Sequence, residues 1–277
     1  MGEKLGGALL RLLACWQAAW QALRARLRPS NDRDWRIEES VLASATVEGD
    51  LLHVRNVRNF EYRSRTDFTP DWYDRSYDLR ELDSVDLVAC YWMGAHVAHV
   101  FLSFGFAGRE HLAISIEARK QQGQGYSSLR GFFREYQLIY VVADERDLVR
   151  QRSNHRRNPS EEVYLYRLKG TQETARRLLL EYVSKINSLH QRPEFYNTLT
   201  TNCTSNIWLH AHVDPGRPPL SWRVLLSGHV PRYLYDCGGL ERSLPFEELR
   251  RRSHINARAL AAESAPDFSQ RIRQGLP

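Results

Sequence analysis

Hydrophobic and polar residues alternate along several stretches of the chain, and these stretches predict strands. Alternation begins at Leu51, and the stretches 138–142 and 163–168 are rich in β-branched and aromatic residues. Apolar residues recur instead at helical spacing over 171–190, behind a threonine suited to capping a helix. A second long helix is predicted over 246–262. Because strands and helices mix with few strand–helix–strand alternations, the pattern predicts an α+β fold.

Two further predicted strands place polar residues on one face. Around His99 the chain alternates, and the stretch 111–119 alternates again, with 105–108 predicted as the hairpin turn between them. A carboxylate or hydroxyl on the second strand, beside His99, would orient its imidazole. Glu117 is therefore the predicted orienting residue, and Ser115, two residues away on the same face, is the alternative.

A candidate nucleophile lies in the run 200–206, where cap-forming polar residues lead directly into an apolar stretch. This pattern places Cys203 in or just before the first turn of a helix. Free backbone N–H groups and the helix dipole favour a thiolate there. Asn202 and Thr204 flank the cysteine and are candidates for holding an oxyanion at the helix start. A buried cysteine behind a polar cap is the structural alternative.

A nucleophilic cysteine needs a base, and His99 is the predicted one. His210 follows Cys203 by seven residues, which puts it about 10 Å further along a helix and out of hydrogen-bonding reach. The base should come from a distant segment, as in sites where cysteine and histidine meet only in the fold. His96 and His99 share a face only in a helix, so a metal pair is disfavoured in a strand, and no metal or cofactor is predicted.

Residues 1–28 carry an apolar stripe at helical spacing, with arginines and glutamines opposite. Polar residues interrupt the run too early for a spanning helix, and neither an unbroken apolar region nor a cleavage site of a signal peptide is clear. We expect an amphipathic helix lying in a membrane interface. A helix packed on the domain or on a partner is the alternative. Residues 29–50 are predicted to be a polar linker, and 51–277 the main domain.

Composition adds limits on the partners. With 277 residues and 42% hydrophobic residues, the chain can bury a sizeable core without a metal or disulfides. A net charge of +6 permits anionic lipid as a partner. Nucleic acid is not expected, because no basic motif interleaved with aromatic residues appears. The four cysteines, at 15, 90, 203 and 237, show no zinc spacing and require no disulfide. Nothing indicates an oligomeric state.

Several blocks, spread in one order over about 55–277, carry a family resemblance. They are VRNFEYRS (57–64), DFTPDWYD (67–74), AHVFLSFGF (98–106), ISIEARK (114–120), GFFREY (131–136), VVADERD (141–147), YNTLTTNCT (196–204), SLPF (243–246) and RSHIN (252–256). With these blocks the chain resembles the bacterial Lnb N-terminal periplasmic domain family. The resemblance implies a circularly permuted papain-like fold of the NlpC type, akin to lecithin:retinol acyltransferase-like proteins. An antiparallel sheet then carries the histidine strand ahead of the cysteine helix, in the order His99, Cys203.

The resemblance also implies a function, because the family's named member is an intramolecular lipoprotein transacylase, which moves an acyl chain from glycerol to an N-terminal amine. Carried over to this chain, Cys203, His99 and Glu117 would form the catalytic site of a thiol acyltransferase. It would act through a thioester on acyl esters of membrane lipid or lipoprotein, at the periplasmic face of the inner membrane. Aromatic residues would hold the acyl chain, namely Tyr91, Trp92, Phe104, Phe106, Phe132, Phe133 and Tyr136. Relatives are expected to carry a fuller membrane anchor than residues 1–28.

Two other functions stay open. A cysteine hydrolase or amidase of cell-envelope substrates would use the same Cys203–His99 pair. A non-catalytic, membrane-bound interaction domain would need no close pair. A deep apolar channel beside Cys203 favours acyl transfer, an open polar groove favours hydrolysis, and a wide separation of the two side chains favours the interaction domain.

Overall fold

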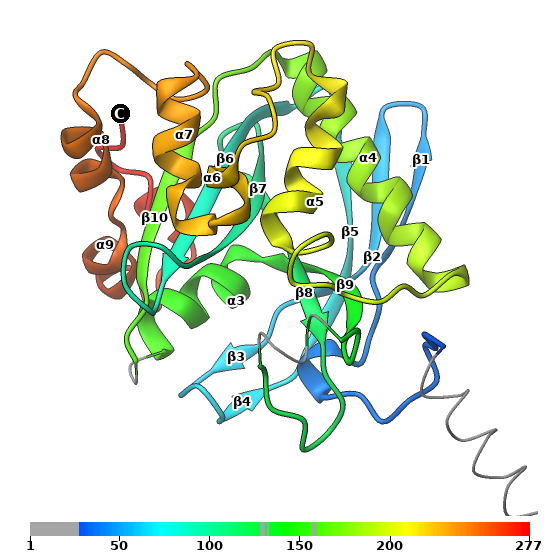
Figure 1. The fold of residues 1–277 in the computed structure, drawn as a ribbon. Coiled ribbons are helices and arrows are strands. Elements are labelled where there is room, and N and C mark those ends of the chain that lie inside the picture. The colour runs from blue at the N-terminus through cyan, green and yellow to red at the C-terminus, as the bar shows by residue number, and fades with distance from the viewer. Residues whose placement is uncertain (1–27, 128–130, 132, 157–158) are drawn as a thin grey trace, which may run out of the picture.

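A mostly antiparallel sheet forms the centre of the molecule (Figure 1). The computed structural model describes residues 28–127, 131, 133–156 and 159–277, so the predicted helix 1–28 lies outside it except for its last residue. The strands of the large sheet are β1 (Ser44–Glu48), β2 (Leu51–Arg58), β5 (Trp72–Asp78), β6 (Leu82–Tyr91), β7 (Ala98–Phe106), β8 (Glu110–Arg119), β9 (Gln137–Asp144) and β10 (Glu162–Arg167).

The strands of this sheet follow the order β1-β2-β9-β8-β7-β6-β10, and β5 pairs with β2 beside this path. Strands β2 and β9 pair in parallel, whereas the other neighbours pair antiparallel. Two short strands, β3 (Glu61–Tyr62) and β4 (Phe68–Thr69), form a separate small sheet. The prediction of a mixed fold built on an antiparallel sheet is therefore confirmed.

Helices cover both faces of the large sheet. They are α3 (Glu145–Arg150), α4 (Gln172–Gln191), α5 (Cys203–His210), α6 (Trp222–Leu225), α7 (Val230–Asp236), α8 (Phe246–Ser253), α9 (Asn256–Ala261) and α10 (Phe268–Arg271). Short 3-10 turns are η1 (Ile37–Glu39), η3 (Ala211–Val213) and η4 (Ser227–His229), and η2 (Gln151–His155) is a π-helical turn.

Alternation along the central strands divides the core between the two faces. Val100 and Leu102 pack on one face with Leu179 of α4 and with Cys203 of α5. Phe101 points to the other face, where the core is completed by residues of α3, α9 and α10. The molecule therefore has three layers, with the sheet between two groups of helices, and α4 and α5 lie together in one outer layer (Figure 1).

Several predicted elements are confirmed. The stretches from Leu51, around His99, and over 111–119, 138–142 and 163–168 belong to β2, β7, β8, β9 and β10. The helix predicted over 171–190 is α4, and Thr171 caps it by accepting a hydrogen bond from the Thr174 N–H. These elements carry strong local patterns, which explains why the sequence predicts them.

The predicted linker 29–50 is wrong in its second half. Residues 44–48 form β1, which pairs with β2 along its whole length, and Trp35 is buried and bridges to Gln121. In β1 and directly before it, the buried residues are Ala45 and Ala43. Small alanines beside serine and threonine do not give the strong apolar alternation that marks a strand, so the pattern looks like a linker.

The helix predicted over 246–262 is two helices. The chain turns extended between α8 and α9, where His254 bridges to Tyr164 and the Ile255 N–H donates to the Val163 carbonyl at 2.9 Å. These contacts pair the break with β10, the last strand of the sheet. The free edge of a strand offers unpaired backbone groups, and the interruption of the helix satisfies some of them.

The predicted turn at 105–108 begins two residues later than expected. Gly105 remains inside β7, paired with Ser84 and His111, and the turn lies at 107–109. A Cβ atom on Gly105 would lie 2.2 Å from the Ser84 hydroxyl oxygen. This glycine therefore allows a close approach of two strands rather than a turn.

Candidate active site

Cys203 is the first residue of α5, as predicted from the capping pattern. Its helix is capped by Asn202, whose side-chain oxygen accepts a hydrogen bond from the Ser205 N–H at 2.8 Å. Backbone N–H groups of Val100 and Thr204 donate to the Cys203 sulfur. The side chain is 9% exposed, so it is reachable only from one side. The helix start therefore holds a thiol among donors that suit an anion.

The ring of His99 shares a hydrogen bond with the Cys203 sulfur. His99 lies near the start of β7, beyond the last hydrogen-bonded pair of β7 and β8, which is Leu102↔Ile114. The start of α5 meets β7 at this point. Nε2 of His99 lies 2.6 Å from the Ser115 hydroxyl, so Nδ1 is the ring nitrogen that remains for the thiol.

Both candidates for orienting His99 contact it. The Ser115 hydroxyl donates to Glu117 Oε1 at 2.9 Å, and the same oxygen lies 3.5 Å from His99 Nε2. Ser115 therefore bridges the imidazole and the carboxylate, while Glu117 also acts on the ring directly. The structure thus brings together all three predicted catalytic side chains, with a hydroxyl added between two of them.

A buried ion network, not predicted from the sequence, continues from Glu117. Arg152 contacts Glu117 at 3.1 Å and Glu161 at 3.2 Å, and Arg156 contacts Glu161 at 2.7 Å. The side chains of Arg152 and Glu161 are 4% and 6% exposed. Arg152 belongs to the π-helical turn η2, a rare element that often marks functional sites. A run of arginines normally indicates a solvated surface, but Arg152 lies in the π-turn and its side chain is buried.

Hydrogen bonds and neighbouring charges shift the pKa values of Cys203, His99 and Glu117. Burial alone would raise the pKa of the Cys203 thiol, but the hydrogen bond and charge of His99 and the N–H groups of Val100 and Thr204 lower it. Burial and Arg152 would lower the pKa of His99, but its bonds to Cys203 and Glu117 raise it. Burial would raise the pKa of Glu117, whereas His99 and Arg152 hold it well below its usual value. The arrangement favours a thiolate beside an imidazolium.

The side chains of Asn202 and Thr204 hold the start of α5 in place. The Asn202 amide donates to the Thr198 carbonyl at 2.8 Å, and the Thr204 hydroxyl donates to the Val224 carbonyl at 2.5 Å. It is the backbone N–H of Thr204, not its hydroxyl, that faces the thiol. An oxyanion at this site would therefore meet backbone N–H groups of the helix start before either of these side chains.

The other candidate histidines lie elsewhere. His210 hydrogen-bonds the Tyr140 hydroxyl at 2.7 Å, and burial lowers its pKa to about 4, so it is neutral at pH 7. His96 pairs with His229, at 2.9 Å between ring nitrogens. Across the described part of the chain, His, Cys, Asp and Glu side chains form no group of three that could hold a metal ion.

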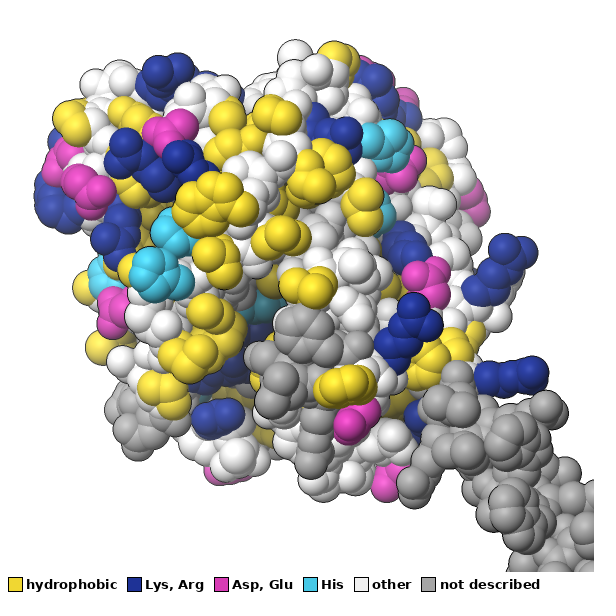
Figure 2. All heavy atoms as spheres, in the orientation of Figure 1, with side chains coloured by type: hydrophobic (Ala, Val, Ile, Leu, Met, Phe, Trp, Pro, Cys, Tyr) yellow, Lys and Arg dark blue, Asp and Glu magenta, His cyan; other side chains and the backbone are white. Residues whose placement is uncertain are grey.

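One segment, α6 with η4, covers the site from outside. The Ala98 N–H donates to the Ser227 hydroxyl at 3.1 Å, and the Gly228 N–H donates to the His96 carbonyl at 3.1 Å. Exposed hydrophobic side chains lie on this segment, on α5 and on the neighbouring loops, and Figure 2 shows hydrophobic side chains gathered on this face of the molecule. They are Met93, Leu199, Leu209, Leu220, Trp222, Leu225 and Leu226.

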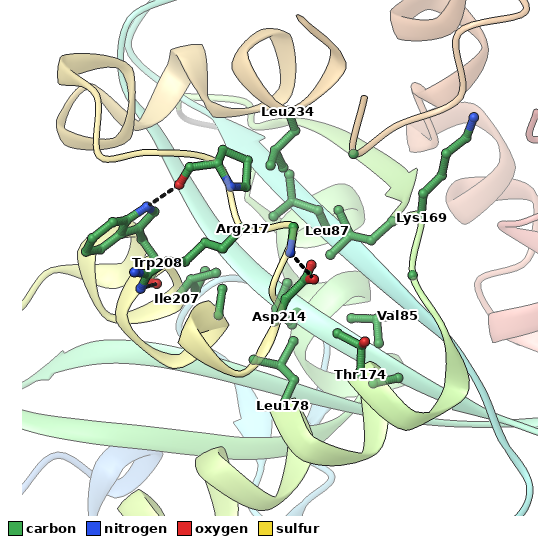
Figure 3. A pocket seen from close by; sticks show the side chains of 18 of the residues that line it. Val85, Leu87, Lys169, Thr174, Leu178, Ile207, Trp208, Asp214, Arg217 and Leu234 are labelled. Atoms are coloured by element: carbon green, nitrogen blue, oxygen red, sulfur yellow. Dashed lines mark hydrogen bonds between the residues drawn. The ribbon is translucent and has the colours of Figure 1, made fainter. Parts of the chain in front are cut away.

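A largely apolar cavity of about 470 Å³, partly open to solvent, lies beside α5 between β6, β7, α4 and α7 (Figure 3). It is not lined by the aromatic residues predicted to hold an acyl chain. Phe104, Phe106 and Tyr136 are core residues, and Phe133 is 77% exposed, whereas Phe132 lies outside the described residues. Aliphatic side chains make up most of the lining instead, and the role expected of the aromatic residues stays a prediction.

Comparison with known protein families agrees with this geometry. A family model described as the Lnb N-terminal periplasmic domain matches residues 68–228, more than half of the chain. The chain belongs to this family. The matched region contains Cys203, His99, Ser115, Glu117 and Arg152, and membership indicates a periplasmic, envelope-related role. Comparisons with curated proteins and with solved structures found no match. Within the described ranges, no helix is both long enough and apolar enough to cross a membrane.

Proposed function

We propose that this protein is a membrane-associated thiol acyltransferase that acts through a Cys203 thioester on acyl esters of lipid or lipoprotein. The observation that carries the proposal is the contact of Cys203, at a helix start, with His99, which Ser115 and Glu117 hold from its other side. Nucleophile, base and orienting group then occupy the three roles of a catalytic triad. The order of histidine strand and cysteine helix supports a circularly permuted papain-like arrangement of NlpC type.

In the first half-reaction, the Cys203 thiolate attacks the carbonyl carbon of the ester. The negative charge moves to the carbonyl oxygen, where backbone N–H groups at the start of α5 stabilise it. The imidazolium of His99 then gives its proton to the departing alcohol oxygen as the carbon–oxygen bond breaks. The products are an alcohol and a Cys203 thioester.

In the second half-reaction, an amine attacks the thioester carbonyl. The now neutral His99 takes a proton from the amine, the carbon–sulfur bond breaks, and the thiolate–imidazolium pair is restored. Glu117 stays ionised through both steps because its role is to stabilise the imidazolium. The products are an amide and free enzyme, so acyl transfer needs no other reactant.

The alternatives differ in what lies next to Cys203. A cell-envelope hydrolase or amidase would use the same pair with water as the second nucleophile, and an open polar groove would favour it. The apolar cavity beside α5 and the exposed hydrophobic side chains around α6 favour a lipid substrate instead. The hydrogen bond between Cys203 and His99 argues against a non-catalytic interaction domain.

Intact-protein mass spectrometry tests the proposal directly. Protein carrying Cys15→Ser and Cys237→Ser, which removes the cysteine outside the described residues and the exposed one, is incubated with phospholipid or a diacylated lipopeptide. We expect a single acyl adduct on Cys203, released as an amide when an amine acceptor is added. Cys203→Ser should show no thioester while remaining folded. Failure to form any adduct with these esters, together with release of peptides from cell-wall material, would support the amidase instead.

Membrane association is proposed for residues 1–28, which carry the amphipathic stripe. Deleting residues 1–28 should lower binding to anionic vesicles, and the remaining binding should weaken as salt rises. Turnover should fall with membrane-embedded substrate and stay unchanged with a soluble ester. Aggregation of the shortened protein in lipid-free buffer would show that the segment packs on the domain, which would refute an interfacial anchor.

A further inference from the structure

The apolar cavity runs along one face of α5, next to the thiol. Thr204, Ile207, Trp208 and Ala211 line it, and this spacing follows one side of the helix for two turns, or about 10 Å. Cys203 immediately precedes the first of these residues. Cys203 and His99 do not themselves line the cavity, which lies next to the proposed nucleophile along the neighbouring face of α5.

Two residues connect the cavity with the reacting sulfur. Val100 and Thr204 both line the cavity, and both donate their backbone N–H groups to Cys203. Val100 also follows His99 directly on β7. Val100 and Thr204 thus contact both the cavity and the Cys203 sulfur, and an acyl chain bound to the sulfur would enter the cavity beside them.

The body of the cavity is aliphatic. Its walls come from β6, β7, α4, α5, α6 and α7, and the residues that supply them are Val85, Leu87, Leu102, Leu178, Ile207, Val224, Val230 and Leu234. Figure 3 shows Leu87, Leu178, Ile207 and Leu234 around one space. Because most of its lining surface is apolar, the cavity offers few hydrogen-bonding partners to water. The walls therefore suit an apolar ligand.

Charged side chains also line the cavity, among the aliphatic ones (Figure 3). Lys169 extends away from the space and contacts Glu241 at 3.3 Å, and Arg217 stacks on Trp208 at 3.9 Å. The Asp214 carboxylate accepts a hydrogen bond from the Gly216 N–H at 2.8 Å. These groups are already occupied by protein partners, so they border the cavity without offering a buried charge to a ligand. An occupant would be uncharged along its length.

We propose that this cavity holds the acyl chain of the substrate, with the carbonyl at Cys203 and the hydrocarbon tail lying along α5. The assignment rests on the proposed acyl transfer and names the part of the substrate that the enzyme selects. A largely aliphatic space beside two residues that contact the nucleophile fits an unbranched chain. The polar portion of the lipid remains outside, on the face that carries the exposed hydrophobic residues of α6.

The first experiment measures chain-length preference in single-turnover acylation of Cys203, in the background that lacks Cys15 and Cys237. In the protein with the wild-type cavity, Cys203 should be acylated roughly 100-fold faster by p-nitrophenyl dodecanoate than by p-nitrophenyl acetate. This is the gain expected from burying a few methylene groups. Ala211→Phe fills part of the cavity and should abolish most of this preference by slowing acylation with the dodecanoate ester. Ala257→Phe, on exposed α9 on the other side of the sheet, is the matched control and should behave as wild type.

A second experiment does not depend on catalysis or on a filled variant. Cys203→Ser protein is irradiated with dodecanoic acid that carries a terminal diazirine, and the labelled peptides are mapped. Labels on α5, α4 or α7 support the cavity, and labels confined to other surfaces, or none, overturn it. Equal acylation by both esters with no effect of Ala211→Phe would also overturn it while leaving acyl transfer intact. Labelling of the cavity without acylation by any ester would instead refute the transferase and retain the binding site.

Discussion

Replacing Glu117 by glutamine tests whether this carboxylate sets the protonation of the Cys203–His99 pair. Glu117 Oε1 lies 3.5 Å from His99 Nε2, and both side chains are less than one-fifth exposed. At an effective dielectric constant of about 20, unit charges at that separation interact by about 5 kcal/mol. Arg152 contacts the same oxygen at 3.1 Å and cancels part of this field. We therefore expect the stabilisation of the imidazolium to fall by about 2 kcal/mol, a factor of about 30 in the equilibrium between the two protonation states.

The direction follows from the charges. Glutamine removes the anion that stabilises the imidazolium, so the pKa of His99 falls and the pKa of the Cys203 thiol rises. The fraction of thiolate then drops at pH values below the usual thiol pKa of about 8.5, where iodoacetamide alkylation of Cys203 should slow by roughly 30-fold. At higher pH the variant and the parent should converge, because both thiols are ionised.

The assay is the rate of alkylation against pH, followed by intact mass in the background without Cys15 and Cys237. Glu110→Gln provides the control, because Glu110 lies on the same strand but is exposed and contacts Arg75. Denaturant unfolding confirms that each variant is folded. A Glu117→Gln profile that coincides with the Glu110→Gln profile would show that the carboxylate does not act on the pair, and the reasoning from these distances would be wrong.

Three further substitutions test other parts of the structure. Asn202→Ala should lower the free energy of unfolding by about 1 kcal/mol through loss of the helix cap. Asn202→Asp should keep a cap acceptor but raise the pKa of the Cys203 thiol, because it places a carboxylate beside the thiol. Equal alkylation profiles for the two variants would argue against an electrostatic role of the helix start. His210→Phe should leave alkylation of Cys203 unchanged, because the pKa of His210 is about 4 and its partner is Tyr140, and a slower reaction would reopen its candidacy as base. Arg273→Met should destabilise the protein by about 3 kcal/mol or more in thermal unfolding, because it removes the arginine that pairs with fully buried Glu145 and one of the two that pair with fully buried Asp86. Exposed Arg271→Met should cost less than about 0.5 kcal/mol. Similar melting temperatures for these two arginine variants would contradict the expected difference in stability.

The site residues that the sequence predicts are those marked by local rules. Strand alternation places Glu117 on the strand face that meets His99, and a polar cap ahead of apolar residues marks Cys203 as the start of a helix. Both rules depend on neighbours within a few residues. These rules therefore apply without knowledge of the tertiary structure. The contact between the strand of His99 and the helix of Cys203 is not set by them, and the order of the two elements in the family supported it.

Other features depend on contacts between distant segments. Arg152 reaches Glu117 only because η2 is wound as a π-turn, and its basic neighbours indicate a solvated surface. The helix break at His254 follows from pairing with β10. The cavity beside α5 arises between β6, β7, α4, α5, α6 and α7, and its aliphatic walls look like ordinary core in the sequence. Each of these is set by tertiary packing, which overrides local propensity.

Cys203 lies on a helix of an outer layer and His99 lies on the central sheet. Their contact therefore reports on the folding of the domain. His99 and Cys203 are about a hundred residues apart, and closing a loop of that length costs about 4 kcal/mol in chain entropy. Their contact therefore cannot form early from local structure, and it should appear only when α5 docks on a sheet that has already paired β6, β7 and β8. During refolding, the gain of a reactive thiolate would mark that docking step. The proposed active site would thus stay unreactive until the core of the domain is complete.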